Sequence, residues 1–320
     1  LKTSHGLVSG DYIIPLVDWM DVAGPIGRTV TDVAILLSAM TGVDAAGEAD
    51  AALGAAQALD YSQFASPEVA VGLTVAIPVA DEAVLDQQLV FLEELDFDIT
   101  DDLRESMRAE LNGRTARMRA IGEQLNEAGL ATVEISASLL PESAPVMDIL
   151  EFGFQDSLNR FAADIEGFPV ETVTDVVALN AEDLANRAPY GQSFVEGSAN
   201  TEQEPAAYAE LKATAREETA ESLRTMLTES GADVMLISAL ISDLTQEYAA
   251  AGFPAITLPM GYGEDGMPIG ILMTADYLGE PQLIAAAYAI EQATMAREAP
   301  DLDAILETFE GLTLATPSVE

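Results

Sequence analysis

Two segments of the sequence repeat one order of elements: an amphipathic helix, a glycine, and an apolar β-rich run. In the first, residues 113–128 have helical spacing, Gly129 follows, and Ala131–Ser136 reads as a strand. In the second, residues 204–230 end at Gly231 and lead into residues 234–238. Helices that stop at glycine and pass into buried strands are typical of α/β proteins. The sequence therefore predicts an α/β fold, a mixed twisted sheet covered by helices, in a single domain over residues 1–320.

The remaining pattern fills in this fold. Residues 29–40 carry apolar side chains at helical spacing, with Thr31 or Asp32 near the start and Gly42 as the stop. Residues 8–16 read as a short strand or extended loop, and residues 44–67 as a surface loop with a short helix. Further strands are expected at residues 71–79, 255–260 and 269–274, and a turn at residues 263–266 joins the last two. Further helices are expected at residues 81–112, 172–189 and 284–297.

The charge is strongly one-sided. The chain carries 55 Asp and Glu against 13 Lys and Arg, for a net charge of -42, and its acidic residues are spread along the whole length. Such a surface repels phosphate backbones, so we expect no nucleic-acid partner. Salt screens self-repulsion, so the composition favours a halophilic or salt-tolerant source. No apolar run approaches about 18 residues, so we expect no membrane span.

Both ends of the sequence contain short motifs that resemble one family. Near the C-terminus these are Gly252, Pro254, Ala255, Ile256, Pro259, Gly261, Gly266, Pro268 and Gly270. At the start they are Leu1-Lys2, Gly6-Leu7-Val8-Ser9, Ile13-Ile14-Pro15, Asp21-Val22-Ala23-Gly24-Pro25 and Arg28-Thr29-Val30-Thr31-Asp32. Together they resemble the amidase signature family. The residues that look like its peptide-amidase-like branch lie in the middle of the chain: Glu151-Phe152, Leu158-Asn159, Leu179-Asn180 and Tyr190-Gly191-Gln192. Turn chemistry alone also accounts for many of these glycines and prolines.

The resemblance implies a chemistry and a boundary. Family members use a serine nucleophile, a bridging serine on a cis peptide and an unprotonated lysine as base. Residues matching these would precede Leu1, because Leu1-Lys2 matches the run after the nucleophile segment. The resemblance thus implies the C-terminal part of an amidase, truncated at its N-terminus and lacking the catalytic residues. The reaction is hydrolysis of a linear carboxamide through an acyl-serine intermediate.

Four residues are candidates for contact with a small-molecule or peptide amide. The resemblance places Asp21, with Trp19 before it, beside the nucleophile segment, and places Tyr190 and Gln192 at the amide-binding cleft. Three of them also have a structural interpretation. Asp21 is favoured as a carboxylate that caps the corner at Gly24-Pro25, Trp19 as a core or rim residue, and Gln192 as a helix cap.

Other sites and functions are less favoured. His5 is the sole histidine and has no assignable triad partners. With no cysteine and no calcium-loop spacing, we expect neither metal nor cofactor. Two alternatives remain: a noncatalytic chain that pairs with a serine-bearing partner, and the glutamine-hydrolysing subunit of a tRNA-dependent amidotransferase. Cytoplasm is favoured over secretion, and the oligomeric state is left open.

Overall fold

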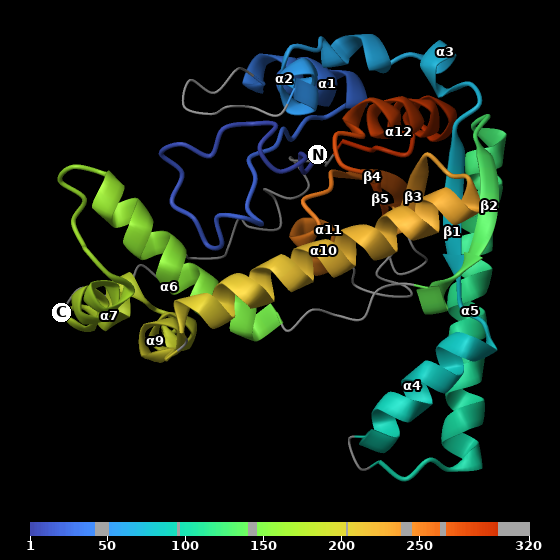
Figure 1. Cartoon of the computed structure of the whole chain (residues 1–320). Coiled ribbons are helices and arrows are strands. Elements are labelled where there is room, and N and C mark those ends of the chain that lie inside the picture. The colour runs from blue at the N-terminus through green and yellow to red at the C-terminus, as the bar shows by residue number, and fades with distance from the viewer. Residues whose placement is uncertain are drawn as a thin grey trace, which may run out of the picture.

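The computed structural model describes residues 1–41, 51–94, 97–139, 146–202, 204–237, 245–262 and 267–299. Its centre is an open five-stranded sheet with the order β2-β1-β3-β5-β4 (Figure 1). The strands are β1 (Thr74–Val79), β2 (Ala131–Ser136), β3 (Val234–Ile237), β4 (Ala255–Tyr262) and β5 (Pro268–Thr274).

The sheet is mixed. β1 runs parallel to both β2 and β3, whereas β5 runs antiparallel to β3 and to β4. Parallel neighbours need a crossover, and the long helices α5 (Asp101–Glu127) and α10 (Pro205–Ser230) supply two of them. The antiparallel β4–β5 pair has an irregularity between Pro259 and Gly261. The mixed α/β sheet expected from the sequence is therefore confirmed.

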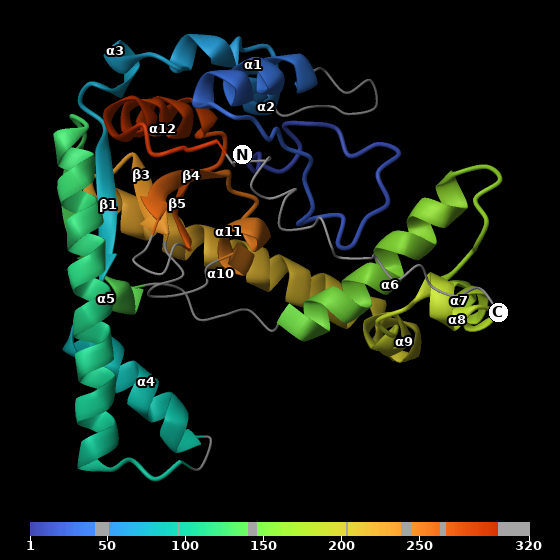
Figure 2. The same ribbon diagram turned by 180° about the vertical axis from the view of Figure 1, so that it is seen from behind.

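Helices cover both faces of the sheet. On one face α5 and α12 (Glu280–Thr294) bury their apolar residues against side chains such as Val75 and Ile77, with α1 (Val30–Met40) packed beyond α12 (Figures 1 and 2). On the other face α10 packs with α11 (Thr245–Ala250). Successive residues of β1 alternate between the two cores, as the period of a strand requires.

A separate helical group lies at the far end of α10. Its first helix, α6, packs against α10 and against α9, and Figure 1 shows this group standing away from the sheet. The group comprises α6 (Val146–Asp164), α7 (Val173–Ala181), α8 (Leu184–Arg187) and α9 (Ser193–Asn200). The other short elements are α2 (Ala51–Gln57), η1 (Tyr61–Phe64), α3 (Pro67–Ala70), α4 (Glu82–Glu94) and η2 (Ala137–Leu139).

Helix boundaries are where the sequence predictions were wrong. The prediction broke residues 81–128 at Gly113, but Gly113 lies inside α5, which begins after Thr100. Thr100 Oγ1 accepts the Leu103 N–H at 3.2 Å, and two aspartates occupy the first turn, so capping decides the start. Likewise, α1 is capped by Thr29, whereas Asp32 lies in its first turn, where the helix dipole favours a carboxylate.

Other predictions were partly correct. Residues 172–189 form two helices, α7 and α8, and residues 8–16 form a loop without strand pairing. The helices α6, α9 and α11 were not predicted. Gly42, Asp44 and the turn at residues 263–266 lie outside the described residues.

Candidate functional site

A cavity of about 510 Å³ lies between the N-terminal loop and the second half of α6. The loop brings its main chain and three aspartates to one wall, and α6 brings four side chains to the other. The lining residues are Gly10, Asp11, Ile13, Pro15, Asp18, Asp21, Val22, Ala23, Ser157, Arg160, Phe161 and Asp164. The cavity therefore joins a segment with family-like motifs to a helix that the sequence did not predict.

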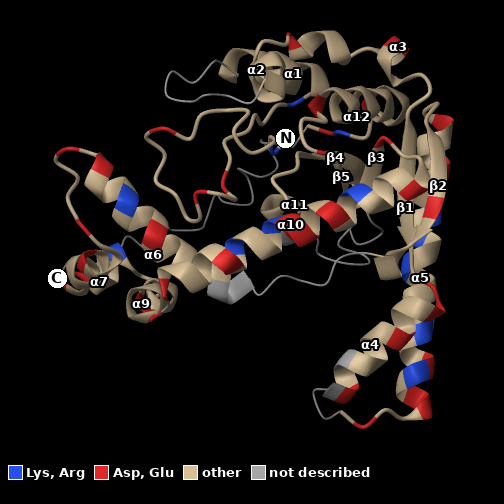
Figure 3. Cartoon of the chain, in the orientation of Figure 1, with Lys and Arg blue, Asp and Glu red and all other residues tan. Residues whose placement is uncertain are grey.

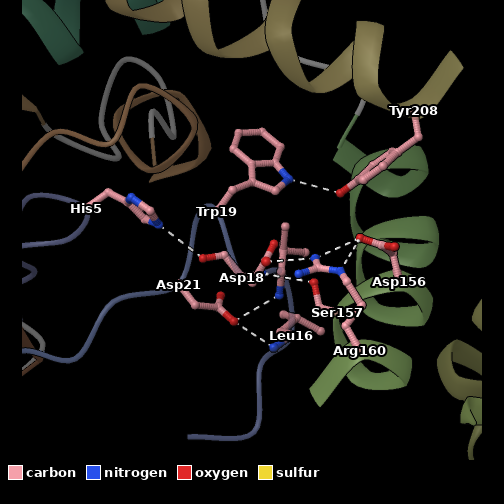
Figure 4. A network of polar contacts seen from close by, with 10 residues as sticks. His5, Leu16, Asp18, Trp19, Asp21, Asp156, Ser157, Arg160 and Tyr208 are labelled. Carbon is pink, nitrogen blue, oxygen red and sulfur yellow. Dashed lines mark hydrogen bonds and ion pairs between the residues drawn. The ribbon is translucent and has the colours of Figure 1, made fainter. Parts of the chain in front are cut away.

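Asp18 is the centre of the polar contacts in this cavity (Figure 4). Its backbone N–H donates to Ser157 Oγ at 3.1 Å, its carbonyl lies 3.1 Å from His5 Nε2, and its carboxylate accepts from Arg160 at 2.7 Å. Arg160 also contacts Asp156 at 2.8 Å, one turn earlier on α6. Hydrogen bonds to Asp156, then to Asp18, raise the pKa of Arg160, so it stays charged.

Asp21 closes the turn that ends the loop. One carboxylate oxygen, Oδ2, accepts the backbone N–H groups of Leu16 at 2.6 Å and Val17 at 2.9 Å (Figure 4). This is the geometry of a carboxylate that caps a corner, and Asp21 also lines the cavity. The following Gly24 passes the chain start so closely that a Cβ there would lie 2.0 Å from the carbonyl oxygen of Leu1. Only glycine fits this approach.

Trp19 lies in the core beside the cavity. It is buried with Val17 and Ile149, and its indole Nε1 donates to the Tyr208 hydroxyl at 3.0 Å (Figure 4). The Lys212 ammonium lies 5.7 Å from the ring centroid. Trp19 therefore fixes the loop that carries Asp18 and Asp21, and it is absent from the residues that line the cavity.

The structure does not bring Tyr190 and Gln192 to this cavity. Tyr190 is fully exposed before α9. Gln192 stands at the N-cap position of α9, but its side chain donates to Glu196 at 3.0 Å and makes no capping bond to the backbone. Within the described residues Gln192 Oε1 is buried and has no partner. Both residues stay predictions as substrate contacts.

Three site residues were missed by sequence reasoning: Asp18, Ser157 and Arg160. A usable signal existed for part of this set, because Asp156 and Arg160 are four residues apart, the spacing of an ion pair on a helix. The contact of Arg160 with Asp18 spans 142 positions, and no local pattern announces it.

A second polar cluster holds the first five residues. Ser4 N–H donates to Glu280 Oε1 at 2.6 Å, Ser4 Oγ accepts the Leu278 N–H at 2.8 Å, and Lys2 Nζ donates to the Phe253 carbonyl at 2.8 Å. Burial lowers the pKa of Lys2 to about 8, against the opposing charge of Glu280, and burial raises the pKa of Glu280. This cluster clamps the chain start to α12.

The described residues contain no group of three or more His, Asp or Glu placed to hold a metal ion. Among the same residues, no helix is both long and apolar enough to cross a membrane. The Lys2 side chain, which lies near the start of the site's loop, directs its hydrogen bonds to the main-chain carbonyls of Thr3 and Phe253.

Comparison with known proteins gives one consistent result. A probable amidase of Arabidopsis thaliana is 28% identical over 309 residues, covering 94% of this chain and 54% of the relative. A glutamyl-tRNA(Gln) amidotransferase subunit from Synechococcus is 28% identical over 306 residues, covering 92% and 59%. No family model matches the chain. The chain thus spans between half and two thirds of the length of these relatives.

Solved structures agree with the sequence relatives. An amidase family protein from Bacillus anthracis superposes with a TM-score of 0.70 at 26% identity, covering 94% of this chain and 54% of the other. The native peptide amidase of Stenotrophomonas maltophilia gives a TM-score of 0.66 at 25% identity, covering 94% and 59%. By its relatives and by its fold, this chain is similar to members of the amidase signature family.

Proposed function

We propose that this chain is the C-terminal part of an amidase that hydrolyses a linear carboxamide to an acid and ammonia or an amine. The observation that carries the proposal is a pair of matches. In sequence, 94% of the chain matches about half of a probable amidase, and in structure, 94% of the chain matches about half of an amidase family protein. A further support is the cavity beside the loop of residues 10–23, which lies in the family-like N-terminal segment.

In this proposal the reaction needs groups outside the 320 residues. A serine hydroxyl attacks the amide carbon, the C–N bond breaks, and the nitrogen leaves with a proton relayed from a lysine base. Water then attacks the acyl ester, which frees the acid and restores the serine. The family resemblance assigns the nucleophile and base to residues that would precede Leu1, and within the described residues the Lys2 side chain donates to the carbonyls of Thr3 and Phe253.

The role of this chain is to shape and position the substrate site. Asp21 holds the turn at Leu16 and Val17, and Asp18 ties that turn to α6 through Ser157 and Arg160. Asp21 is therefore the candidate contact residue whose placement agrees best with a substrate-lining role. Substrate contacts by Trp19, Tyr190 and Gln192 are kept as proposals, with Trp19 acting through the loop it supports.

The test compares two preparations. The purified chain alone should release no ammonia from simple amides or a peptide amide above a mock purification. The chain expressed with the coding sequence found upstream of Leu1 should release ammonia, and replacing its serines by alanine should abolish that release. Ammonia release by the chain alone would overturn the assignment of the nucleophile.

Two other functions keep a specific basis. Several curated relatives are subunits of glutamyl-tRNA(Gln) amidotransferases, so a glutamine-hydrolysing subunit is the second candidate. Glutamine hydrolysis that appears only with a co-purified partner protein would favour it. A separate serine-bearing chain that restores ammonia release on mixing would favour the noncatalytic pairing role.

A further inference from the structure

A second cavity, of about 300 Å³, lies where α10 meets the end of α11 and the loop between β5 and α12. Two arginines of α10, Arg216 and Arg224, line it together with Glu217, Tyr277 and small side chains that include Ala213 and Ala220. It shares no lining residue with the cavity beside the N-terminal loop, so it is a separate feature of the molecule. The basic residues of α10 are visible in Figure 3.

The guanidinium groups of the two arginines converge on consecutive residues. Arg224 Cζ lies 5.2 Å from the ring centroid of Phe253. At Gly252, whose φ is +73°, an added Cβ would lie 3.5 Å from Arg216 Nη2. Consecutive Cα atoms are about 3.8 Å apart. Two side chains that leave α10 eight positions apart therefore reach neighbouring points on the opposite wall.

The helix provides no counter-charge for Arg216. Side chains three and four positions apart are neighbours on a helix, and at these spacings from Arg216 the sequence has Lys212, Ala213, Thr219 and Ala220. Within the described residues the Arg216 side chain forms no ion pair and no hydrogen bond, although it is half-buried. In a chain with 55 Asp and Glu, a half-buried guanidinium without a carboxylate indicates a place for an external anion.

Two carboxylates lie near the cavity, and neither forms an ion pair with Arg216 within the described residues. Asp276 Oδ1 accepts Arg224 Nε at 2.9 Å and the Tyr277 N–H at 2.7 Å. Glu217 directly follows Arg216, and consecutive residues of a helix do not face each other. Asp276 therefore uses one donor of the Arg224 fork and leaves its terminal nitrogens to the cavity.

His5 reports the charge of Arg216 from behind the cavity. Burial lowers the pKa of His5, and repulsion from Arg216 and then from Lys2 lowers it further, against the hydrogen bond with the Asp18 carbonyl. The His5 carbonyl in turn accepts the Tyr277 hydroxyl at 2.9 Å. Arg216 thus acts on its neighbours as an uncompensated positive charge.

We propose that this cavity binds a small oxyanion, with a phosphate or carboxylate group held between Arg216 and Arg224. A planar guanidinium donates two parallel hydrogen bonds to either kind of group, which gives the site its chemical preference. The small side chains of Ala213 and Ala220 leave the space above α10 that the anion occupies. The inference goes beyond the proposed function and does not rest on it, because binding here requires no hydrolysis of an amide.

The test is isothermal titration of the purified chain with inorganic phosphate and, separately, with succinate. Ionic strength is kept constant by exchange against KCl, because salt alone alters the repulsion within a chain of net charge -42. Arg216→Gln should weaken binding at least about tenfold, since charge-assisted hydrogen bonds are lost. The matched control is Arg117→Gln, because Arg117 is an exposed arginine of α5 that forms no ion pair within the described residues. It should bind both anions as the unaltered chain does.

The two anions distinguish the sources of the oxyanion. Saturable binding of phosphate alone would identify a phosphate group as the ligand, and saturable binding of succinate alone would identify a carboxylate. Either result, with the loss in Arg216→Gln, supports the site. No saturable binding of either anion, or equal weakening by Arg216→Gln and Arg117→Gln, would overturn the proposal.

The sole histidine supplies a second readout that needs no variant, so a folding defect cannot imitate it. A bound anion offsets the charge of Arg216, so the pKa of His5, followed through the NMR signals of its imidazole ring, should rise when the binding anion saturates the chain. Asp18 and Lys2, the other charged groups that act on His5, are present in both states. A His5 pKa that stays the same at saturation would contradict binding beside Arg216.

Discussion

Trp19 Nε1 donates a hydrogen bond to the Tyr208 hydroxyl at 3.0 Å, across 189 positions of sequence. Tyr208 also packs on Phe152 with ring centroids 4.5 Å apart. A Cβ at Gly153 would lie 2.7 Å from the Tyr208 hydroxyl, so this contact depends on a glycine in α6. The bond thereby connects the N-terminal loop, α6 and α10 around the candidate cavity.

Loss of this bond should weaken the fold. Trp19→Phe and Tyr208→Phe should each lower the free energy of unfolding by about 1–2 kcal/mol, because each leaves a buried polar partner unpaired. The double variant should cost less than the sum of the two. Urea unfolding of the four proteins measures the coupling, and strictly additive losses would contradict a direct bond of any weight.

Asp21 should matter through the turn it caps. Asp21→Ala should destabilise the chain by about 1–2 kcal/mol, because two backbone N–H groups lose a charged acceptor. Asp11→Ala is the matched control, since Asp11 lines the same cavity and its carboxylate makes no hydrogen bond within the described residues. In the protein expressed with the coding sequence upstream of Leu1, Asp21→Ala should also lower kcat/KM for amide hydrolysis more than Asp11→Ala does. If the two variants lose the same unfolding free energy and the same kcat/KM, Asp21 has no special role in the site.

Stability should rise with pH because of Lys2. Its pKa is about 8 in the fold and near 10.5 unfolded, so between these values the unfolded chain holds more protons. The free energy of unfolding should increase there by on the order of 3 kcal/mol, at about 1.4 kcal/mol per pKa unit. The lowered pKa of the Leu1 amino group acts in the same direction.

The measurement is the difference in the free energy of unfolding between the unaltered chain and the Lys2→Met variant across pH 8 to 10.5. The subtraction removes the effects of Leu1 and of general charge repulsion. A difference that is flat over this range would show that the Lys2 ammonium is as well solvated in the fold as in the unfolded chain.

Salt should stabilise the protein strongly. Figure 3 shows acidic residues on the helices and on the loops, whereas the basic residues lie mainly on α5 and α10. The ion pairs present, such as Arg108–Glu82 and Arg119–Glu134, have exposed partners and contribute little. Raising KCl from about 0.05 M to about 2 M should screen this repulsion and raise Tm markedly. A sharp transition with the same Tm at both concentrations would argue against adaptation to salt.

Several features followed from the sequence. The strands β1 to β5 were found because each is a short apolar run bounded by turn residues. Gly129 and Gly231, which both have positive φ, mark the ends of α5 and α10, and Gly231 is the C-cap residue itself. Thr100 as the start of α5, by contrast, was hidden, because a charged, continuous helical pattern runs on both sides of it.

What the sequence by itself determined is the local pattern: the α/β class, the strands, most of the long helices and the family motifs at both ends. Only the tertiary structure decided that Asp18 meets Arg160, that Trp19 bonds Tyr208, and that Lys2 pairs with Ala255 at the outer edge of β4. The physical reason is range. Periodicity and capping act within a few residues, whereas these contacts join positions more than a hundred apart, and only packing of the whole chain brings them together.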